Sequence, residues 1–320
     1  MVCVPLLFWA LLGRSQASEP SVQPWATPLG LPERAVRGDE REDELAALGA
    51  RLFFDPILSS DRTVACASCH RPEHNFADDL PFSSGVAGRT TTRNSPTLLN
   101  RAFGTRFMWD GRAASLEEQV LLPIENPLEM DLPLERALER LTSAPAYRSS
   151  FQGFFARPPA REDLARALAS YVSRLVLGDS PVDRFRAGNF EALTDSARAG
   201  LWFYESRGGC WRCHSGANFT DEEFHNTGVG AQDGLPEPGR AAITGADADR
   251  GRFKTPTLRG LVATAPYMHD GSLASLEDVV EFYRQGGRAN SALDPVLAPL
   301  EMSPEDARNL VAFLRALSER

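Results

Sequence analysis

Two copies of the pattern Cys-x-x-Cys-His stand in this chain of 320 residues, one at 66–70 and one at 210–214. Two thiols at this spacing can bond to the two vinyl groups of one haem, and the adjacent histidine can give the iron a nitrogen ligand. A single Cys-x-x-Cys could instead be a redox dithiol or half of a zinc site, but two copies, each followed by histidine, favour haem attachment. The sequence therefore predicts two covalently bound c-type haems, attached through Cys66, Cys69, Cys210 and Cys213, with His70 and His214 as proximal iron ligands.

The fifth cysteine, Cys3, lies in an apolar N-terminal segment. This segment, residues 1–17, ends in the small-residue sequence Ser-Gln-Ala and has the shape of a signal peptide. Its apolar run is too short for a transmembrane helix, and no later stretch reaches the ~18 uninterrupted apolar residues that a span needs. We therefore expect an exported protein without a membrane span. Because c-type haem is attached outside the bacterial cytoplasm, the expected location is the periplasm.

The composition is that of a folded globular protein, with 42% hydrophobic and 24% charged residues, so a core can form without disulfide bonds. The formal net charge of −9 argues against nucleic acid and anionic membrane surfaces as partners. Lys254 is the only lysine among 34 basic residues, which we attribute to codon bias. The length is about twice that of a typical domain and predicts two domains with one haem each.

Helical periodicity dominates the chain, and strand signals are weak. Residues 18–40 are rich in proline, glycine and charge, which is typical of an extended N-terminal arm. Apolar residues at helical spacing predict helices from Asp43 to Asp55, over 161–177, from Thr194 or Asp195 to the glycine pair at 208–209, over 276–283, and from Ser303 onwards. The Gly-Asp-Ser-Pro sequence at 178–181 predicts a hinge or domain boundary.

In each half a helix precedes a turn rich in glycine or serine and then a haem motif. The predicted fold is mostly α, with an N-terminal haem domain over 41–180 and a C-terminal haem domain over 181–320. Both domains are expected to be similar to cytochrome c, with long loops packed around the haems.

Further motifs surround the two haem motifs. They are Arg-Asn-Ser-Pro-Thr-Leu-Leu-Asn at 93–100, Met-Trp-Asp-Gly-Arg at 108–112, Leu-Glu-Glu-Gln at 116–119, Asn-Pro-Leu-Glu-Met at 126–130, and Thr-Ala-Pro-Tyr-Met-His-Asp-Gly-Ser at 264–272. With these motifs, residues 40–320 resemble the bacterial dihaem cytochrome c peroxidase and MauG family, and more closely its MauG-like branch. The resemblance implies that the N-terminal haem is the peroxide site and that the C-terminal haem receives or stores electrons.

Over the first haem, the resemblance implies that Glu129 is the acid–base residue and that Gln119 is the neighbouring distal amide. A carboxyl group there can take the proton from one peroxide oxygen and return it to the other, as heterolytic O–O cleavage requires. The alternative is that Glu129 only caps the turn at 126–131. Pro123 is expected to line the same pocket.

Trp109 and Arg112 fall in the stretch where the family places an aromatic ring between the haems. Trp109 is therefore the expected electron relay, a role that is compatible with a buried core indole. The peroxidase branch of the family carries a distal histidine in the loop that corresponds to 83–88, and this loop has none here. His74 follows His70 too closely to reach the opposite haem face, so we expect it at the surface or against a haem propionate. The first haem is thus expected to be open at rest, as in MauG.

For the second haem, the resemblance places the sixth iron ligand at Tyr283, where MauG has a tyrosine. An anionic oxygen would stabilise the ferric and higher oxidation states. Met268 is the rival ligand, because a thioether would raise the potential. A third interpretation is that Tyr283 is a packed aromatic and that water or Met268 completes the site. His225 has no ligand role in the resemblance and is expected to be a hydrogen-bonded loop residue.

The resemblance also implies a calcium ion between the domains, held by oxygens of Asn94, Thr264 and Pro266, since oxygen donors suit this cation. The implied substrate is hydrogen peroxide, and the implied electron donor is a small redox protein, a cytochrome c or a cupredoxin. Two alternatives stay open: a MauG-type enzyme that oxidises a protein side chain, and a dihaem electron carrier without turnover. The sequence is compatible with a homodimer.

Overall fold

The computed structural model describes residues 22, 27–33 and 40–318. The predicted leader at 1–17 lies outside these residues, and the predicted arm is described only at 22, 27–33 and 40. Across the described residues, no helix is both long enough and apolar enough to cross a membrane.

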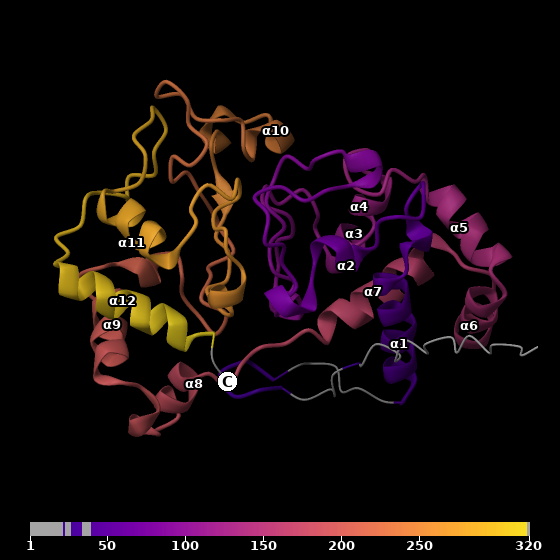
Figure 1. Cartoon of the computed structure of the whole chain (residues 1–320), viewed down its shortest axis with the longest axis horizontal. Coiled ribbons are helices and arrows are strands. Elements are labelled where there is room, and N and C mark those ends of the chain that lie inside the picture. The colour runs from indigo at the N-terminus through magenta and orange to yellow at the C-terminus, as the bar shows by residue number, and fades with distance from the viewer. Residues whose placement is uncertain (1–21, 23–26, 34–39, 319–320) are drawn as a thin grey trace, which may run out of the picture.

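Helices and loops make up nearly all of the described chain, which confirms the mostly α prediction (Figure 1). In the first half the helices are α1 (Glu40–Phe54), α2 (Cys66–Cys69), α3 (Leu116–Gln119), α4 (Leu122–Glu125), α5 (Leu134–Ser143), α6 (Pro145–Phe155) and α7 (Arg161–Ser173). In the second half they are α8 (Pro181–Arg186), α9 (Asp195–Glu205), α10 (Ala241–Thr244), α11 (Leu276–Arg284) and α12 (Pro304–Ala316). Two short strands, β1 (Phe224–His225) and β2 (Phe253–Lys254), pair antiparallel.

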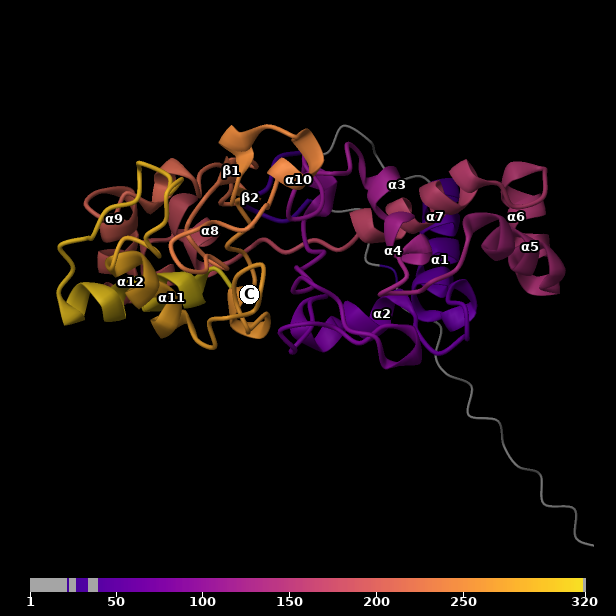
Figure 2. The same ribbon diagram turned by 90° about the horizontal axis from the view of Figure 1, so that it is seen from above.

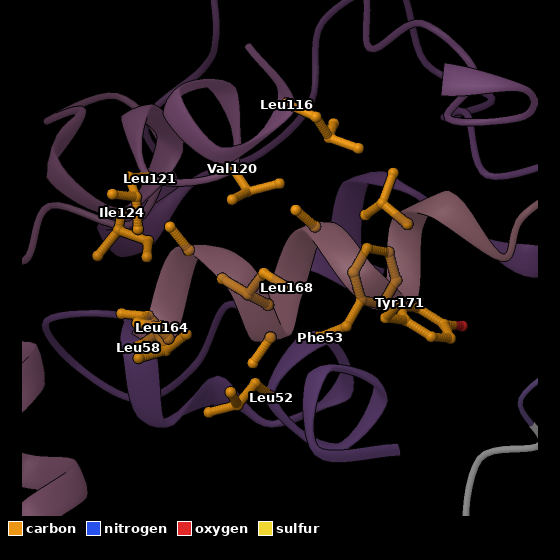
Figure 3. Close-up of a cluster of buried hydrophobic side chains, with 14 of the residues drawn as sticks. Leu52, Phe53, Leu58, Leu116, Val120, Leu121, Ile124, Leu164, Leu168 and Tyr171 are labelled. Carbon is orange, nitrogen blue, oxygen red and sulfur yellow. The ribbon is translucent and has the colours of Figure 1, made fainter. Parts of the chain in front are cut away.

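The helices α1 and α7 cross at the centre of the first half. A Cβ atom on Gly49 of α1 would lie 1.9 Å from the carbonyl oxygen of Ala167 in α7, so glycine is what allows the two backbones to approach so closely. Around the crossing, apolar side chains from α1, α3, α4, α7 and the turns that follow α1 and α3 form one buried cluster (Figure 3). Its labelled members are Leu52, Phe53, Leu58, Leu116, Val120, Leu121, Ile124, Leu164, Leu168 and Tyr171.

The second half is built around a similar crossing of α9 and α12. Here a Cβ atom on Gly200 would lie 1.9 Å from the carbonyl oxygen of Asn309. The predicted starts of both helices are confirmed. Thr194 caps α9 by accepting a hydrogen bond from the backbone of Ala197, and Ser303 caps α12 in a reciprocal pair with the third residue of the helix.

The predicted helix over 161–177 is wrong at its C-terminal end, because α7 stops at Ser173. The side chain and backbone of Asn100 supply hydrogen bonds in place of those that a continuing helix would make. Its Oδ1 accepts from the backbone of Leu177 at 2.9 Å, and its backbone N–H donates to the carbonyl of Leu175 at 2.8 Å. These contacts draw the chain after α7 into an extended path between the two halves (Figures 1 and 2).

The residues predicted as a hinge are tightly held. Ser180 is fully buried and caps α8, and Asp183 of α8 forms a buried ion pair with Arg259, with N–O distances of 2.7 and 2.8 Å. Arg259 also donates to the carbonyl of Gly30 in the arm. The hydrophobic clusters of the two halves nevertheless separate here, the first ending at Leu177. The division into haem domains at 180/181 stays a prediction.

The two halves repeat one local structure that the sequence reading missed. One isolated antiparallel bridge joins Phe107 to Ala113, and another joins Tyr267 to Leu273. Each bridge encloses a Met-x-Asp-Gly turn whose methionine has a positive φ, and a helix with a serine cap follows. The repeat matches Trp109 with His269 and Pro123 with Tyr283.

Candidate active site

The first Cys-x-x-Cys-His motif is preorganised to hold a haem. Cys66 and Cys69 are free thiols on α2, and His70 follows the helix directly. Nδ1 of His70 donates a hydrogen bond to the carbonyl of Phe76 at 3.0 Å, which leaves Nε2 available for iron. Burial lowers the pKa of His70, so its imidazole is held in the neutral form that binds a metal.

The second motif has the same arrangement. Nδ1 of His214 donates to the carbonyl of Phe219 at 3.1 Å, and burial lowers the pKa of His214 to about 4. The hydroxyl of Tyr204 donates to the backbone carbonyl of His214 and so fixes the turn. Cys210 is also a free thiol, whose pKa burial raises to about 11. Both motifs therefore present two thiols and a neutral imidazole with a free nitrogen, the donor set that a c-type haem requires.

One cavity brings the first motif together with the residues predicted to act over its haem. Its walls include apolar side chains of the first-half core, such as Phe53, Leu168 and Val172. The predicted functional residues on its lining are Cys66, Cys69, His70, Asn94, Trp109, Arg112, Gln119, Pro123 and Glu129. Apolar walls, covalent anchors and distal polar groups in one cavity fit a haem.

Glu129 combines the two interpretations that the sequence left open. Its Oε1 accepts a hydrogen bond from Nδ2 of Asn126 at 2.6 Å within the turn, and its side chain also lines the cavity. Burial raises the pKa of Glu129, and the opposing effects of Asn126 and Arg112 are smaller. The side-chain amide of Gln119 has no protein hydrogen-bond partner among the described residues and is free to contact a ligand in the cavity.

The loop at 83–88, which lacks a histidine, supports the backbone of Glu129. The N–H of Val86 donates to the carbonyl oxygen of Glu129 at 2.8 Å. A Cβ atom on Gly85 would lie 2.1 Å from the carbonyl of Leu128, so only glycine fits there. His74 lies outside the cavity lining, with Nε2 3.8 Å from Asp79, in agreement with the expected surface position.

Tyr283 lies close to the second motif. Burial raises its pKa, with smaller contributions from the charges of Cys213 and Cys210, which places its ring near the two attachment sulfurs. In the described part of the chain, its hydroxyl makes no hydrogen bond to protein and is available to an iron atom. Its repeat partner Pro123 lines the first cavity, which supports a matching distal position. Met268, the rival candidate for the sixth ligand, lies in the turn of the second half that corresponds to the Met108 turn of the first half.

His225 is hydrogen-bonded as expected, but it lies in strand β1 and not in a loop. Nδ1 is 2.7 Å from Asp294, and Nε2 is 3.1 Å from Asp221. Its pKa is raised to about 10, chiefly by a hydrogen bond with Cys213 and then by the two carboxylates, against the effect of burial. Cys213, Asp221 and His225 lie within 4.8 Å of one another, but a thioether at Cys213 removes that sulfur from any further metal site.

Arg101 and Lys254 also line the first cavity, and the sequence reading missed both. The attribution of the single lysine to codon bias stays a prediction, but it overlooked a structural role: Lys254 is only 8% exposed and bonds to Glu222. Its isolation in a chain otherwise rich in arginine was the available signal.

Comparison with known proteins agrees with this geometry. A family profile described as di-haem cytochrome c peroxidase matches residues 43–191. The methylamine utilization protein MauG of Methylorubrum extorquens is 39% identical over 310 residues, which cover 96% of this chain and 84% of that protein. The cytochrome c551 peroxidase of Pseudomonas aeruginosa is 34% identical over 298 residues, which cover 90% of this chain and 83% of that protein.

Among solved structures, a MauG-like protein associated with microbial copper homeostasis superposes with a TM-score of 0.81 at 29% identity, over 92% of this chain and 94% of the other. The diheme peroxidase BthA from Burkholderia thailandensis gives a TM-score of 0.74 at 23% identity, over 94% and 95%, and supports the fold alone. Membership of the matching family implies two c-type haems. On this sequence and structural similarity, the chain belongs to the dihaem cytochrome c peroxidase and MauG family of peroxide-using oxidoreductases.

Proposed function

We propose that this chain is a periplasmic dihaem peroxidase that reduces hydrogen peroxide at the His70 site. Electrons pass through the His214 site from a small redox protein, a cytochrome c or a cupredoxin. The observation that carries the proposal is Glu129, a carboxyl group in the same cavity as His70 whose pKa burial raises. The bound haem supplies the iron that binds peroxide and exchanges electrons with it.

Glu129 moves the proton that O–O cleavage requires. As a carboxylate it accepts the proton of one peroxide oxygen, and as an acid it returns this proton to the other oxygen, which leaves as water. Asn126 donates to Oε1, and Oε2 accepts no hydrogen bond from the described residues, so Oε2 is the oxygen available to peroxide. The amide of Gln119 holds the peroxide within reach. Overall, two electrons from the redox partner and two protons convert one peroxide molecule into two water molecules.

Trp109 stands where electrons would cross between the halves. Its Nε1 donates to the carbonyl of Asn94 at 2.8 Å, and its own carbonyl accepts from the backbone of Lys254 in the second half at 2.7 Å. The first bond fixes the indole in the first half, and the second ties the backbone of Trp109 to the second half. We therefore assign Trp109 as the electron relay between the two haem sites.

Oxidation of a protein side chain, as in MauG, is the second candidate function. The half-buried Tyr283 near Cys210 and Cys213 favours it, because an anionic oxygen ligand would stabilise a stored oxidising equivalent. Relatives with names of both kinds match the chain to a similar extent. A non-catalytic electron carrier is disfavoured because these relatives are enzymes.

One further assignment belongs to the proposal. A calcium ion between the halves would bind Oδ1 of Asn94 together with oxygens of Thr264 and Pro266. Oδ1 is left for this role because Nδ2 is the side-chain atom of Asn94 that donates a hydrogen bond to the carbonyl of Leu80. The N–H of Asn94 donates to the carbonyl of His269, which brings it against the segment that holds the other two.

The proposal is tested by peroxide reduction in Glu129→Gln. A general acid–base residue contributes about 10²- to 10⁴-fold to rate, so the variant should lose turnover by that factor while both haems stay attached. Glu117→Gln on α3 is the matched control, since Glu117 is exposed and absent from the cavity lining. Unchanged turnover in Glu129→Gln would remove the residue from the mechanism. A comparison of peroxide turnover in the presence and in the absence of a reduced small cytochrome separates the two candidate functions.

A further inference from the structure

Lys254 and Arg101 reach the first haem cavity from opposite halves of the molecule. Lys254 lies on strand β2 of the second half and Arg101 in a turn of the first, and both line the cavity. The side chains are 9% and 10% exposed, so two positive charges are buried at the boundary between the halves.

One carboxylate is shared between these two cations. Glu222 of the second half is bonded to Arg101 at 3.0 and 3.3 Å and to Lys254 at 3.4 Å, and its side chain is only 11% exposed. The backbone N–H groups of Thr105 and Arg106 also donate to Glu222, each at 2.9 Å. The cluster therefore holds two positive charges against one negative charge.

No other carboxylate of the described residues completes the charge balance. Besides its bond to Glu222, the Nζ atom of Lys254 donates a hydrogen bond to the carbonyl of Thr255 at 2.9 Å, and this carbonyl carries no charge. The nearby Asp221 is bonded to His225 and to a backbone N–H. A buried charge without a counter-ion is costly, so an anion is expected in the space that both cations line. Burial, with the charge of Arg101, lowers the pKa of Lys254 to about 8, which is consistent with a missing anion.

We propose that Arg101 and Lys254 bind a propionate carboxylate of the first haem. A haem carries two propionate groups, and this cavity is the one that holds His70 and its distal residues. One propionate brings the cluster to two positive and two negative charges, and its bonds tie the first haem to both halves at once. The inference rests on the proposed function only in that a haem occupies the His70 cavity.

Redox titration of the holoprotein tests this contact. Removing a positive charge beside a propionate favours the oxidised iron, so Lys254→Met should shift the midpoint potential of the first haem downwards. The charge-conserving Lys254→Arg should keep the midpoint of the parent protein. Arg136→Met removes the same charge from the exposed face of α5 and is the matched control. A shift in Lys254→Met no larger than that in Arg136→Met would overturn the proposal, as would an equal shift in Lys254→Arg.

Resonance Raman spectroscopy gives a second readout on the same samples. The propionate bending band should move in Lys254→Met and stay in place in Lys254→Arg, whereas a band unmoved in both would overturn the contact. If Lys254→Met does not give folded holoprotein, Lys254→Gln replaces it in both measurements. A failed contact would leave peroxide turnover and its dependence on Glu129 intact, so the two proposals fail separately.

Discussion

The imidazole of His269 lies edge to face against the indole of Trp109, with ring centroids 6.2 Å apart. The two residues hold matched positions in the repeat that relates the halves. Two backbone hydrogen bonds between the halves hold this pair in place. The N–H of Asn94 donates to the carbonyl of His269, and the N–H of Lys254 donates to the carbonyl of Trp109. The boundary between the halves is therefore a fixed contact on which an electron relay can be built.

Replacing Trp109 by phenylalanine should slow electron transfer between the two haems. Phenylalanine keeps a ring in the cavity wall but is harder to oxidise and cannot donate to Asn94. Stopped-flow absorbance should show slower re-reduction of the first haem, with both haems attached. Trp202→Phe, at a position 58% exposed on α9, is the control and should be neutral. Equal rates in the two variants would exclude the relay.

Peroxide turnover should decline on the acid side at a higher pH than an ordinary glutamate predicts. Glu129 accepts a proton only as a carboxylate, and burial raises its pKa above the usual 4.5, so activity is lost as pH falls through the raised value. Asn126→Ala removes a hydrogen bond that lowers this pKa and should move the acid limb of kcat/KM further upwards. An acid limb at or below pH 4.5, or one that Asn126→Ala leaves in place, would contradict this role.

Changing Tyr283 to phenylalanine should alter the low-spin EPR signal of the oxidised protein. Removal of the hydroxyl takes away the sixth ligand proposed for the second haem, while the ring still packs on α11. Met268→Leu serves as the comparison and should leave the signal unchanged. The opposite pattern would assign the ligand to Met268.

Asp183→Ala should destabilise the fold by about 3–5 kcal/mol, because it leaves the buried guanidinium of Arg259 without its partner. Burial alone would raise the pKa of Asp183, but Arg259 and Ser180 outweigh it and lower the pKa. The stabilisation is therefore present above the unfolded pKa and is lost as pH falls through the lower folded value. Denaturant unfolding at pH 7 and pH 3 measures both effects.

Glu139→Ala is the control, because it breaks an exposed ion pair with Arg136 and should lower the free energy of unfolding by under about 1 kcal/mol. A similar loss of stability in both variants would refute the ion-pair account.

The sequence was informative where local signals act. Serine and threonine caps located the starts of α9 and α12 within one residue, and the haem motifs specified attachment and proximal ligands. Family motifs correctly pointed to residues that share one cavity, including Gln119 and Glu129.

Local sequence patterns could not predict contacts between residues that are far apart in the chain. The end of α7 depends on Asn100, which reaches Leu177 from a distant segment. The burial of Lys254 depends on Glu222 and Arg101, which come from different halves. Neither periodicity nor motif spacing reports such pairings, so the charge cluster emerged only from the structure.

The EPR spectrum of the oxidised holoprotein tests the central claim most directly. An open iron position in the cavity of Glu129 and Gln119 predicts a high-spin ferric signal from the first haem beside a low-spin signal from the second. Two low-spin signals with no high-spin component would contradict a peroxide site at His70.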